Sequence, residues 1–160
     1  MEINIGEPKE LMQFSIGILN KLLADEFVLL AKSWNFHWNI VGPSFGSYHK
    51  FLEDIYNDAI NNVDDVAERI RTLGGRPLGS LKEYMANTRL KEYDYNQPLP
   101  DGLGMFKILL DDYETIIREI RKDLKDLEAQ QVMDEGTMSY LQDLIYRMGK
   151  NCWMIRAHLA

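Results

Sequence analysis

The sequence is poor in cysteine and histidine, and it lacks long apolar runs and strand-like alternation. Its single cysteine, Cys152, excludes an internal disulfide and fits a reducing cytoplasm. Because Cys152 lies within an apolar helical pattern, we expect a buried structural thiol. No apolar stretch approaches the ~20 residues of a membrane-spanning helix. The first ten residues, MEINIGEPKE, also lack the basic start and apolar run of a secretory signal. We therefore expect one cytoplasmic domain over residues 1–160, with no membrane segment.

Positive charge is in the minority. The chain has 18 basic and 25 acidic side chains, a formal net charge of −7. This balance argues against attraction of nucleic acid by the whole surface. The most basic stretch, residues 118–125, alternates cations with acids, which is typical of a solvated helix face.

Apolar residues recur with helical spacing in four long segments. Pro8 suits a first helical turn, and the first helix should run to about Ile40, before Gly42 and Pro43. The second should begin near Ser44 or Ser47 and end at Gly74-Gly75. The predicted apolar stripes are Leu11, Phe14, Ile18, Leu22 and Leu29; Leu52, Ile55, Ala59, Val66, Ile70 and Leu73; Met105, Ile108, Leu109, Ile116, Ile117, Ile120, Leu124 and Leu127; and Met138, Leu141, Leu144, Ile145, Met148, Trp153, Ile155 and Leu159.

A connection rich in proline and glycine separates the two pairs of helices. It extends from Gly74 to about Asp101, which is long for a structureless loop, so we expect a short helix near Ser80 to Ala86. The sequence thus predicts an all-α, ferritin-like four-helix bundle with one long crossover between helices two and three.

Two of the three histidines and three acids stand out by their spacing. His37 and His49 flank the first turn, His49 and Glu53 are four residues apart, and Asp64 and Glu68 repeat that spacing. Relative to His49, the three acids project at about +40°, +60° and +100° around the second helix. All four therefore share one broad stripe, apart from the apolar one.

In one chain, the pair His49 and Glu53 is too far along the helix from the pair Asp64 and Glu68 for both to bind the same ion. Glu53 and Asp64 are about 16 Å apart along the axis, whereas metal–ligand bonds are near ~2 Å. A second, antiparallel copy of the helix across a two-fold axis would bring Asp64 and Glu68 beside the partner's His49 and Glu53 and form two equivalent sites. The interspersed Tyr56, Ile60 and Ala67 would give apolar contact there.

The ligand types suit ferrous iron, with manganese or zinc open on the same grounds. Acids at such spacing are more commonly a solvated helix face, and an isolated histidine usually has no metal. Spacing alone therefore leaves both interpretations open.

Residues 35–84 resemble the Dps family of mini-ferritins, named for DNA protection during starvation. The shared pattern is FHWN, a glycine-containing turn, a histidine twelve residues after the first, and D-x-x-A-E-R-I-x-x-L-G-G-x-P-x-G-S-L. The resemblance implies a hollow homododecamer with ferroxidase sites at two-fold interfaces. His37, His49 and Glu53 would come from one subunit, and Asp64 and Glu68 from its neighbour. There Fe²⁺ would be oxidised by hydrogen peroxide or oxygen, and ferric mineral would be stored inside, which suppresses hydroxyl-radical chemistry.

The resemblance also bears on four individual positions. Members of the family usually have aspartate where this chain has Glu53, whose side chain is one methylene longer; we still expect Glu53 to bind iron. Trp38 resembles an aromatic residue near the family's site, with packing and redox roles both open. Asp134 and Asp143 fall where acids line the pores that admit iron, although acids at a helix start also favour the helix dipole.

Three rival interpretations were weighed. A DNA-compacting protein is disfavoured, because residues before Pro8 include no lysine or arginine, and twelve copies at −7 each give −84. Bridging by magnesium, a local basic patch or association with the nucleoid stays open. A conventional ferritin would carry two E-x-x-H motifs, and this chain has none. A bundle with an inactive site would not be expected to keep ligand-capable residues at all five positions.

Overall fold

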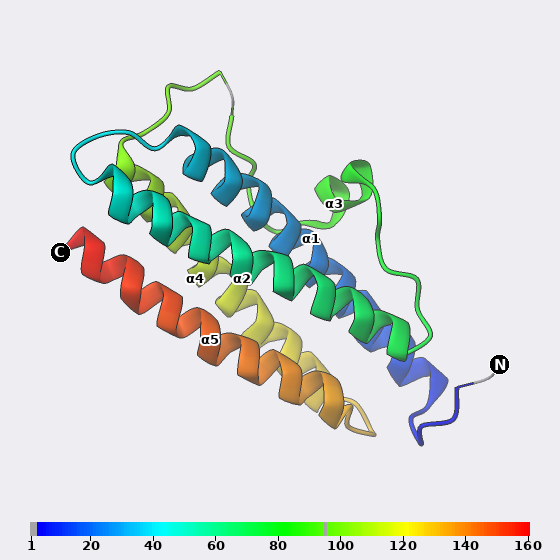
Figure 1. The fold of residues 1–160 in the computed structure, drawn as a ribbon. Helices are drawn as coiled ribbons and strands as arrows, with labels where there is room; N and C mark the ends of the chain where they lie inside the picture. The colour runs from blue at the N-terminus through cyan, green and yellow to red at the C-terminus, as the bar shows by residue number, and fades with distance from the viewer. Residues whose placement is uncertain (1–2, 95) are drawn as a thin grey trace.

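The computed structural model describes residues 3–94 and 96–160, and these residues form helices without any strand. The helices are α1 (Lys9–Asn39), α2 (Phe45–Thr72), α3 (Leu81–Asn87), α4 (Gly102–Glu128) and α5 (Glu135–Leu159). The four long helices form a bundle, and α3 lies beside α1 within the crossover from α2 to α4 (Figure 1). This confirms the predicted all-α bundle with one long crossover that contains a short helix.

The expected stop and start signals set the helix ends. α1 begins directly after Pro8, and α2 is followed by Gly74 with φ of +82°, a conformation that favours glycine. Ser44 occupies the N-cap position of α2, but its side chain makes no capping bond, and Ser47 instead donates to the Ser44 carbonyl. The predicted serine cap is therefore wrong in its chemistry, although the helix begins where expected.

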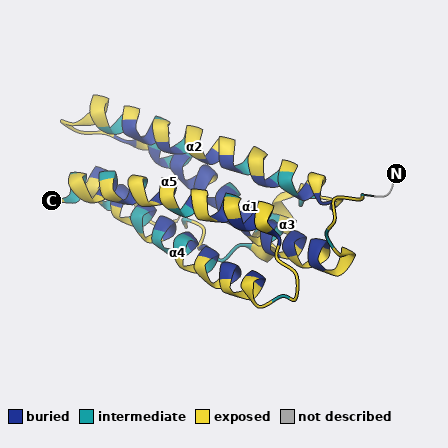
Figure 2. Cartoon of the chain, turned by 90° about the horizontal axis from the view of Figure 1, so that it is seen from below, coloured by how far each residue is buried: buried dark blue, intermediate teal, exposed yellow. Residues whose placement is uncertain are grey.

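Each long helix has one buried face and one exposed face (Figure 2), and the buried faces supply the apolar core. All six apolar residues predicted for α2 are buried, and so is Cys152. Phe14 and Trp153, which were predicted within apolar stripes, are instead 37% and 65% exposed. Phe14 projects about 60° from Leu11 and Trp153 about 180° from Leu144, so each lies away from the centre of its stripe.

Buried ion pairs of Arg89 connect the crossover to the bundle. Arg89 donates from Nε to Asp25 of α1 at 2.7 Å and from Nη1 to Asp123 of α4 at 2.7 Å. The Arg89 backbone N–H and the Thr88 hydroxyl also donate to Asp25. One arginine thus joins α1, α4 and the segment after α3.

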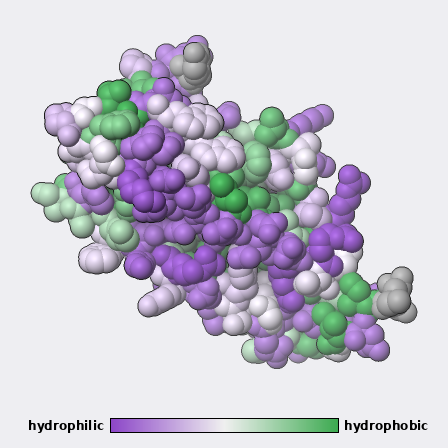
Figure 3. Space-filling model, viewed as in Figure 1, coloured by the Kyte–Doolittle hydropathy of each residue, from purple (hydrophilic) through white to green (hydrophobic). Residues whose placement is uncertain are grey.

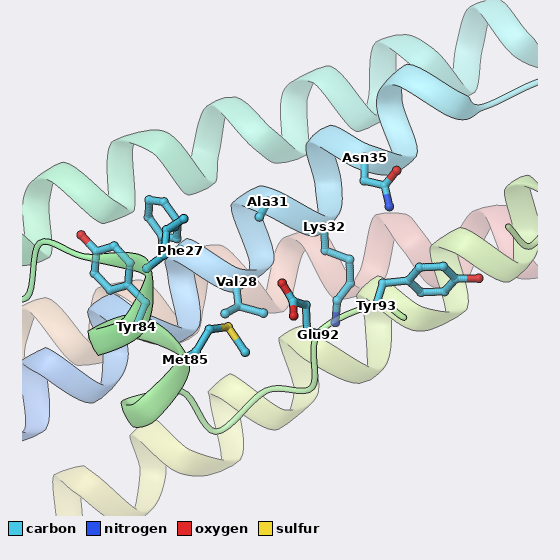
Figure 4. Close-up of a pocket in the computed structure, with 10 residues that line it drawn as sticks. Phe27, Val28, Ala31, Lys32, Asn35, Tyr84, Met85, Glu92 and Tyr93 are labelled. Carbon is cyan, nitrogen blue, oxygen red and sulfur yellow. The ribbon is translucent and has the colours of Figure 1, made fainter. Parts of the chain in front are cut away.

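The crossover encloses a pocket of about 190 Å³ against α1 (Figure 4). The rings of Phe27 and Tyr84 stack at 4.2 Å at one end of it. Lys32 contributes to the wall, but its ammonium donates to Asp112 at 2.6 Å and to the Lys91 carbonyl at 2.7 Å. The charge of Lys32 is therefore balanced within the protein, and none of the five predicted metal ligands lines this pocket.

Among the described residues, no helix is long and apolar enough to cross a membrane.

Candidate metal centre

His37, near the end of α1, and His49, near the start of α2, face each other across the first turn. Their rings stack with centroids 3.7 Å apart. His37 Nδ1 lies 2.9 Å from the His49 carbonyl oxygen, and His49 Nδ1 lies 3.0 Å from the His37 carbonyl oxygen. The turn therefore brings together two histidines that are twelve residues apart.

This reciprocal bonding fixes the state of both rings. A carbonyl oxygen can only accept, so each Nδ1 must carry a proton and donate it. In the neutral imidazoles the lone pair is then on each Nε2, which has no partner within the described residues. A backbone carbonyl on the far nitrogen is the usual support of a metal-binding histidine. The two side chains are thus preorganised as nitrogen ligands.

Glu53 lies one turn beyond His49 on α2 and is half-buried. Its Oε2 is 3.1 Å from Nζ of Lys50, which also bonds Asp54 at 2.7 Å. A metal that binds Glu53 must therefore compete with this ammonium. The sequence interpretation missed Lys50, although its position three residues before Glu53 would have indicated the contact.

Asp64 and Glu68 are exposed on α2. Within one protomer, no three His, Cys, Asp or Glu side chains among residues 3–94 and 96–160 could hold a metal together. The chain brings His37 and His49 together but does not bring all five predicted ligands to one point. The assignment of these five residues to a shared site stays a prediction.

Aromatic side chains surround the histidine pair. Tyr56 meets the His37 ring edge-on at 5.0 Å, and Trp34 stacks on Trp38 at 6.1 Å. Trp38 is nevertheless 70% exposed. Ile60, between the two ligand pairs on α2, is also exposed. Apolar groups therefore lie beside the ligand positions on the protomer surface.

The rest of this face is polar. In Figure 3, hydrophilic side chains form a band through the middle of the molecule, along the path that α2 follows in the same view of Figure 1. The carboxylates of Asp64 and Glu68 are exposed to solvent on this face. They can therefore offer charge to a cation without a burial penalty.

The two candidate pore residues differ in their surroundings. Asp134 is fully buried, accepts from the Thr137 backbone N–H at 2.8 Å, and pairs with Arg69 at 2.8 Å. It caps α5 and joins that helix to α2, which favours a structural role over the predicted pore lining. Asp143 is exposed and pairs with Arg147 on the same helix, so its carboxylate is within reach of solvent.

The chain is similar to known proteins over nearly its whole length. The family model described as a ferritin-like domain matches residues 16–160. The DNA protection during starvation protein 2 of Bacillus anthracis is 35% identical over 144 residues, which cover 90% of this chain and 95% of that protein. The DNA protection during starvation protein of Helicobacter pylori is 39% identical over 145 residues, covering 89% and 96%.

A solved structure supports the same assignment. The Dps protein of Vibrio cholerae, described as a member of a broad superfamily of ferritin-like diiron-carboxylate proteins, superimposes with a TM-score of 0.89 at 32% identity, covering 100% of this chain and 98% of that one. The fold and the histidine–carboxylate surface thus define a ferritin-like protein. Within that class, the chain belongs to the Dps family of mini-ferritins. Membership indicates iron binding, with iron storage or DNA protection as the general role.

Proposed function

We propose that this protein oxidises Fe²⁺ and stores the ferric product, at sites that two copies of the chain build together. His37, His49 and Glu53 of one subunit would bind iron with Asp64 and Glu68 of the other. The assembly would be a homododecamer that acts in the cytoplasm, with iron as substrate and cargo. Asp143 is the better of the two candidates for lining a path by which iron reaches the interior.

The histidine pair is the observation that carries this proposal. Two stacked imidazoles donate their Nδ1 protons to backbone carbonyls, which leaves the Nε2 atom of each ring available as a ligand. Two nitrogens and one carboxylate leave an iron ion short of ligands and of negative charge. The exposed carboxylates of Asp64 and Glu68 supply both, but only from a second copy, because they lie three to four turns further along α2.

The chemistry balances with hydrogen peroxide as oxidant. Two Fe²⁺ ions each lose one electron, and H₂O₂ with two protons accepts both electrons and becomes two waters. Two electrons delivered together avoid the one-electron cleavage that releases hydroxyl radical. Carboxylate ligands favour the ferric product because they are hard, anionic donors. Oxygen is the alternative acceptor.

The first test is ferrous oxidation by His37→Ala and Asp64→Ala. Fe²⁺ is added without oxygen, then peroxide or oxygen is admitted and ferric absorbance is followed. Each variant should lose at least about tenfold in initial rate, since even outer-shell changes cost that much. Asp65→Ala, an exposed acid next to Asp64, is the matched control and should behave as wild type. Unchanged rates in the two site variants would refute the site.

Sharing between subunits is tested by mixing the two inactive chains. In a mixed dimer, one site combines the intact histidines of the Asp64→Ala chain with the intact acids of the His37→Ala chain. Random pairing in co-expressed protein should therefore restore about a quarter of the wild-type sites. Light scattering confirms assembly of each sample. Activity that stays at the level of the single variants would show that the site lies within one chain.

A further inference from the structure

A single glutamate, Glu26, lies in the interior of the bundle away from the candidate metal centre. It belongs to α1 and is fully buried. Its Oε2 accepts one long hydrogen bond, 3.3 Å from Nδ2 of Asn62 on α2. Its Oε1 is buried and has no hydrogen-bond partner among the described residues. A carboxylate with this little support is unusual in a protein core.

The nearby charges are committed elsewhere. Arg147 of α5 donates from Nη1 to Asn62 Oδ1 at 2.7 Å and from Nε to Asp143 at 2.8 Å, so it reaches Glu26 only through Asn62. Asp25, the neighbour of Glu26 on α1, is paired with Arg89. No cation therefore forms an ion pair with Glu26 within the described residues.

The remaining neighbours are acids and phenols. Asp58 of α2 adds negative charge, although it accepts from Asn151 of α5 at 3.2 Å. Tyr113 of α4 and Tyr140 of α5 interact electrostatically with Glu26. A protonated Glu26 would carry an O–H donor of its own, whereas an ionised Glu26 would have only one long hydrogen bond to support its charge.

We propose that Glu26 holds a proton at neutral pH, as a neutral hydrogen-bonding acid inside the bundle, and that losing this proton in mild alkali loosens the contact between α1, α2 and α5. The proton site is separate from the metal site, because Glu26 is not among the five proposed ligands. The inference also stands without the proposed function.

Electrostatics gives the direction of the effect. Burial raises the pKa of Glu26 from 4.5 to about 8, and the Asn62 hydrogen bond opposes this only in part. Because the folded-state pKa is raised, the stabilising contribution is complete below pH 4.5 and is lost as pH rises to about 8. Across that window the folding equilibrium should weaken by up to roughly three orders of magnitude.

Infrared spectroscopy of the assembled wild-type protein tests the protonation itself. At neutral pH the spectrum should contain the C=O stretch of a protonated carboxylic acid, which shifts when glutamate is labelled with ¹³C. The band should disappear on titration near pH 8 and should be absent from Glu26→Gln. The isotope label assigns the band to glutamate even if the variant folds poorly. A spectrum without this band at neutral pH would overturn the proposal.

Urea unfolding of wild type, Glu26→Gln and Glu10→Gln at pH 5 and pH 8.5 tests the consequence. Glutamine keeps the size of Glu26 and cannot ionise, so Glu26→Gln should lose much less stability than wild type between the two pH values. Glu10→Gln makes the same change on the exposed side of α1 and should retain the wild-type pH dependence. Equal pH dependence in all three proteins would show that Glu26 does not control the alkaline loss.

Discussion

Lys50 is the side chain that most directly opposes metal binding at the candidate centre. Its ammonium contacts both Glu53 and Asp54, and it is exposed to solvent. The contacts raise the pKa of Lys50, first through the hydrogen bond that its ammonium donates to Asp54, so this residue remains charged throughout the neutral range. Any cation that binds Glu53 therefore meets a neighbouring positive charge.

We expect Lys50→Gln to strengthen binding of a divalent probe such as Co²⁺ to the assembled protein. Removing the ammonium frees Glu53 and lowers the local positive potential, so the apparent Kd should fall a few-fold at low ionic strength. The gain should shrink in high salt, because exposed charges are screened. Spectroscopic Co²⁺ titrations at two salt concentrations measure both effects. The control is Lys107→Gln, which removes an exposed lysine from α4. If Lys50→Gln and Lys107→Gln bind Co²⁺ with the same apparent Kd at low salt, the prediction is wrong.

At the residue scale, the sequence predicts that His37 and His49 flank one turn, but it does not predict the contacts that their rings make. The spacing of His37 and His49 could be read directly, whereas the reciprocal bonds of Nδ1 to carbonyls depend on how the turn closes. Asp25 and Glu26 are adjacent acids inside an apolar run, which already indicates buried charge. Asp25 is paired with a cation and Glu26 is not, because Arg89 contacts Asp25 whereas only Asn62 bonds Glu26. Both partners are distant in sequence and come close only in the fold.

The crossover is an element whose position depends on charge as much as on apolar packing. α3 is seven residues long and has no buried residue, so it cannot be stable by itself. Its Ser80–Glu83 capping box satisfies its first turn, and Arg89 then secures the following segment to α1 and α4. The ion pair thus adds to the contact that the partly buried Tyr84 of α3 makes with the core.

Arg89→Met should therefore destabilise the protein by about 3 kcal/mol, because it leaves the fully buried Asp25 without its cation. Chemical denaturation at neutral pH measures the loss. Arg76→Met removes an exposed arginine from the same connection and should change stability little. The role given to Arg89 would be wrong if the two variants unfold at the same denaturant concentration.

At the element scale, prediction from sequence succeeds where one local signal decides. Pro8 and Gly74 mark helix ends that the structure has, and the length of the connection alone predicts α3. The prediction that Phe14 and Trp153 belong to the apolar stripes is wrong, because an apolar residue near a stripe in sequence need not lie on the same helix face. Their projection around the helix places them outside, and an isolated sequence does not reveal whether another subunit covers them.

The charge of the whole molecule bears on DNA binding, because the family is named for DNA protection. The net charge is −7, and hydrophilic side chains form an exposed band along the path of α2 (Figure 3). The basic side chains of α4 are partly paired with acids: Arg118 lies 3.8 Å from Glu114, and Lys122 contacts Glu119. A polyanion approaching the protein therefore meets a molecule whose net charge is negative.

We expect the assembled protein not to retain duplex DNA in a gel-shift assay at low salt without divalent cations. Nucleic-acid affinity comes chiefly from cations that displace counterions from phosphate, and the net charge of −7 on each chain opposes that exchange. Magnesium can bridge carboxylates to phosphates, so any retention should appear only with Mg²⁺ and vanish with chelator. The comparison variant is Asp54→Lys, which reverses one exposed charge on each subunit. It should increase the fraction of DNA that the protein retains. Tight binding by wild type in chelator would instead indicate a local basic patch, and physical protection of DNA would then become the leading function.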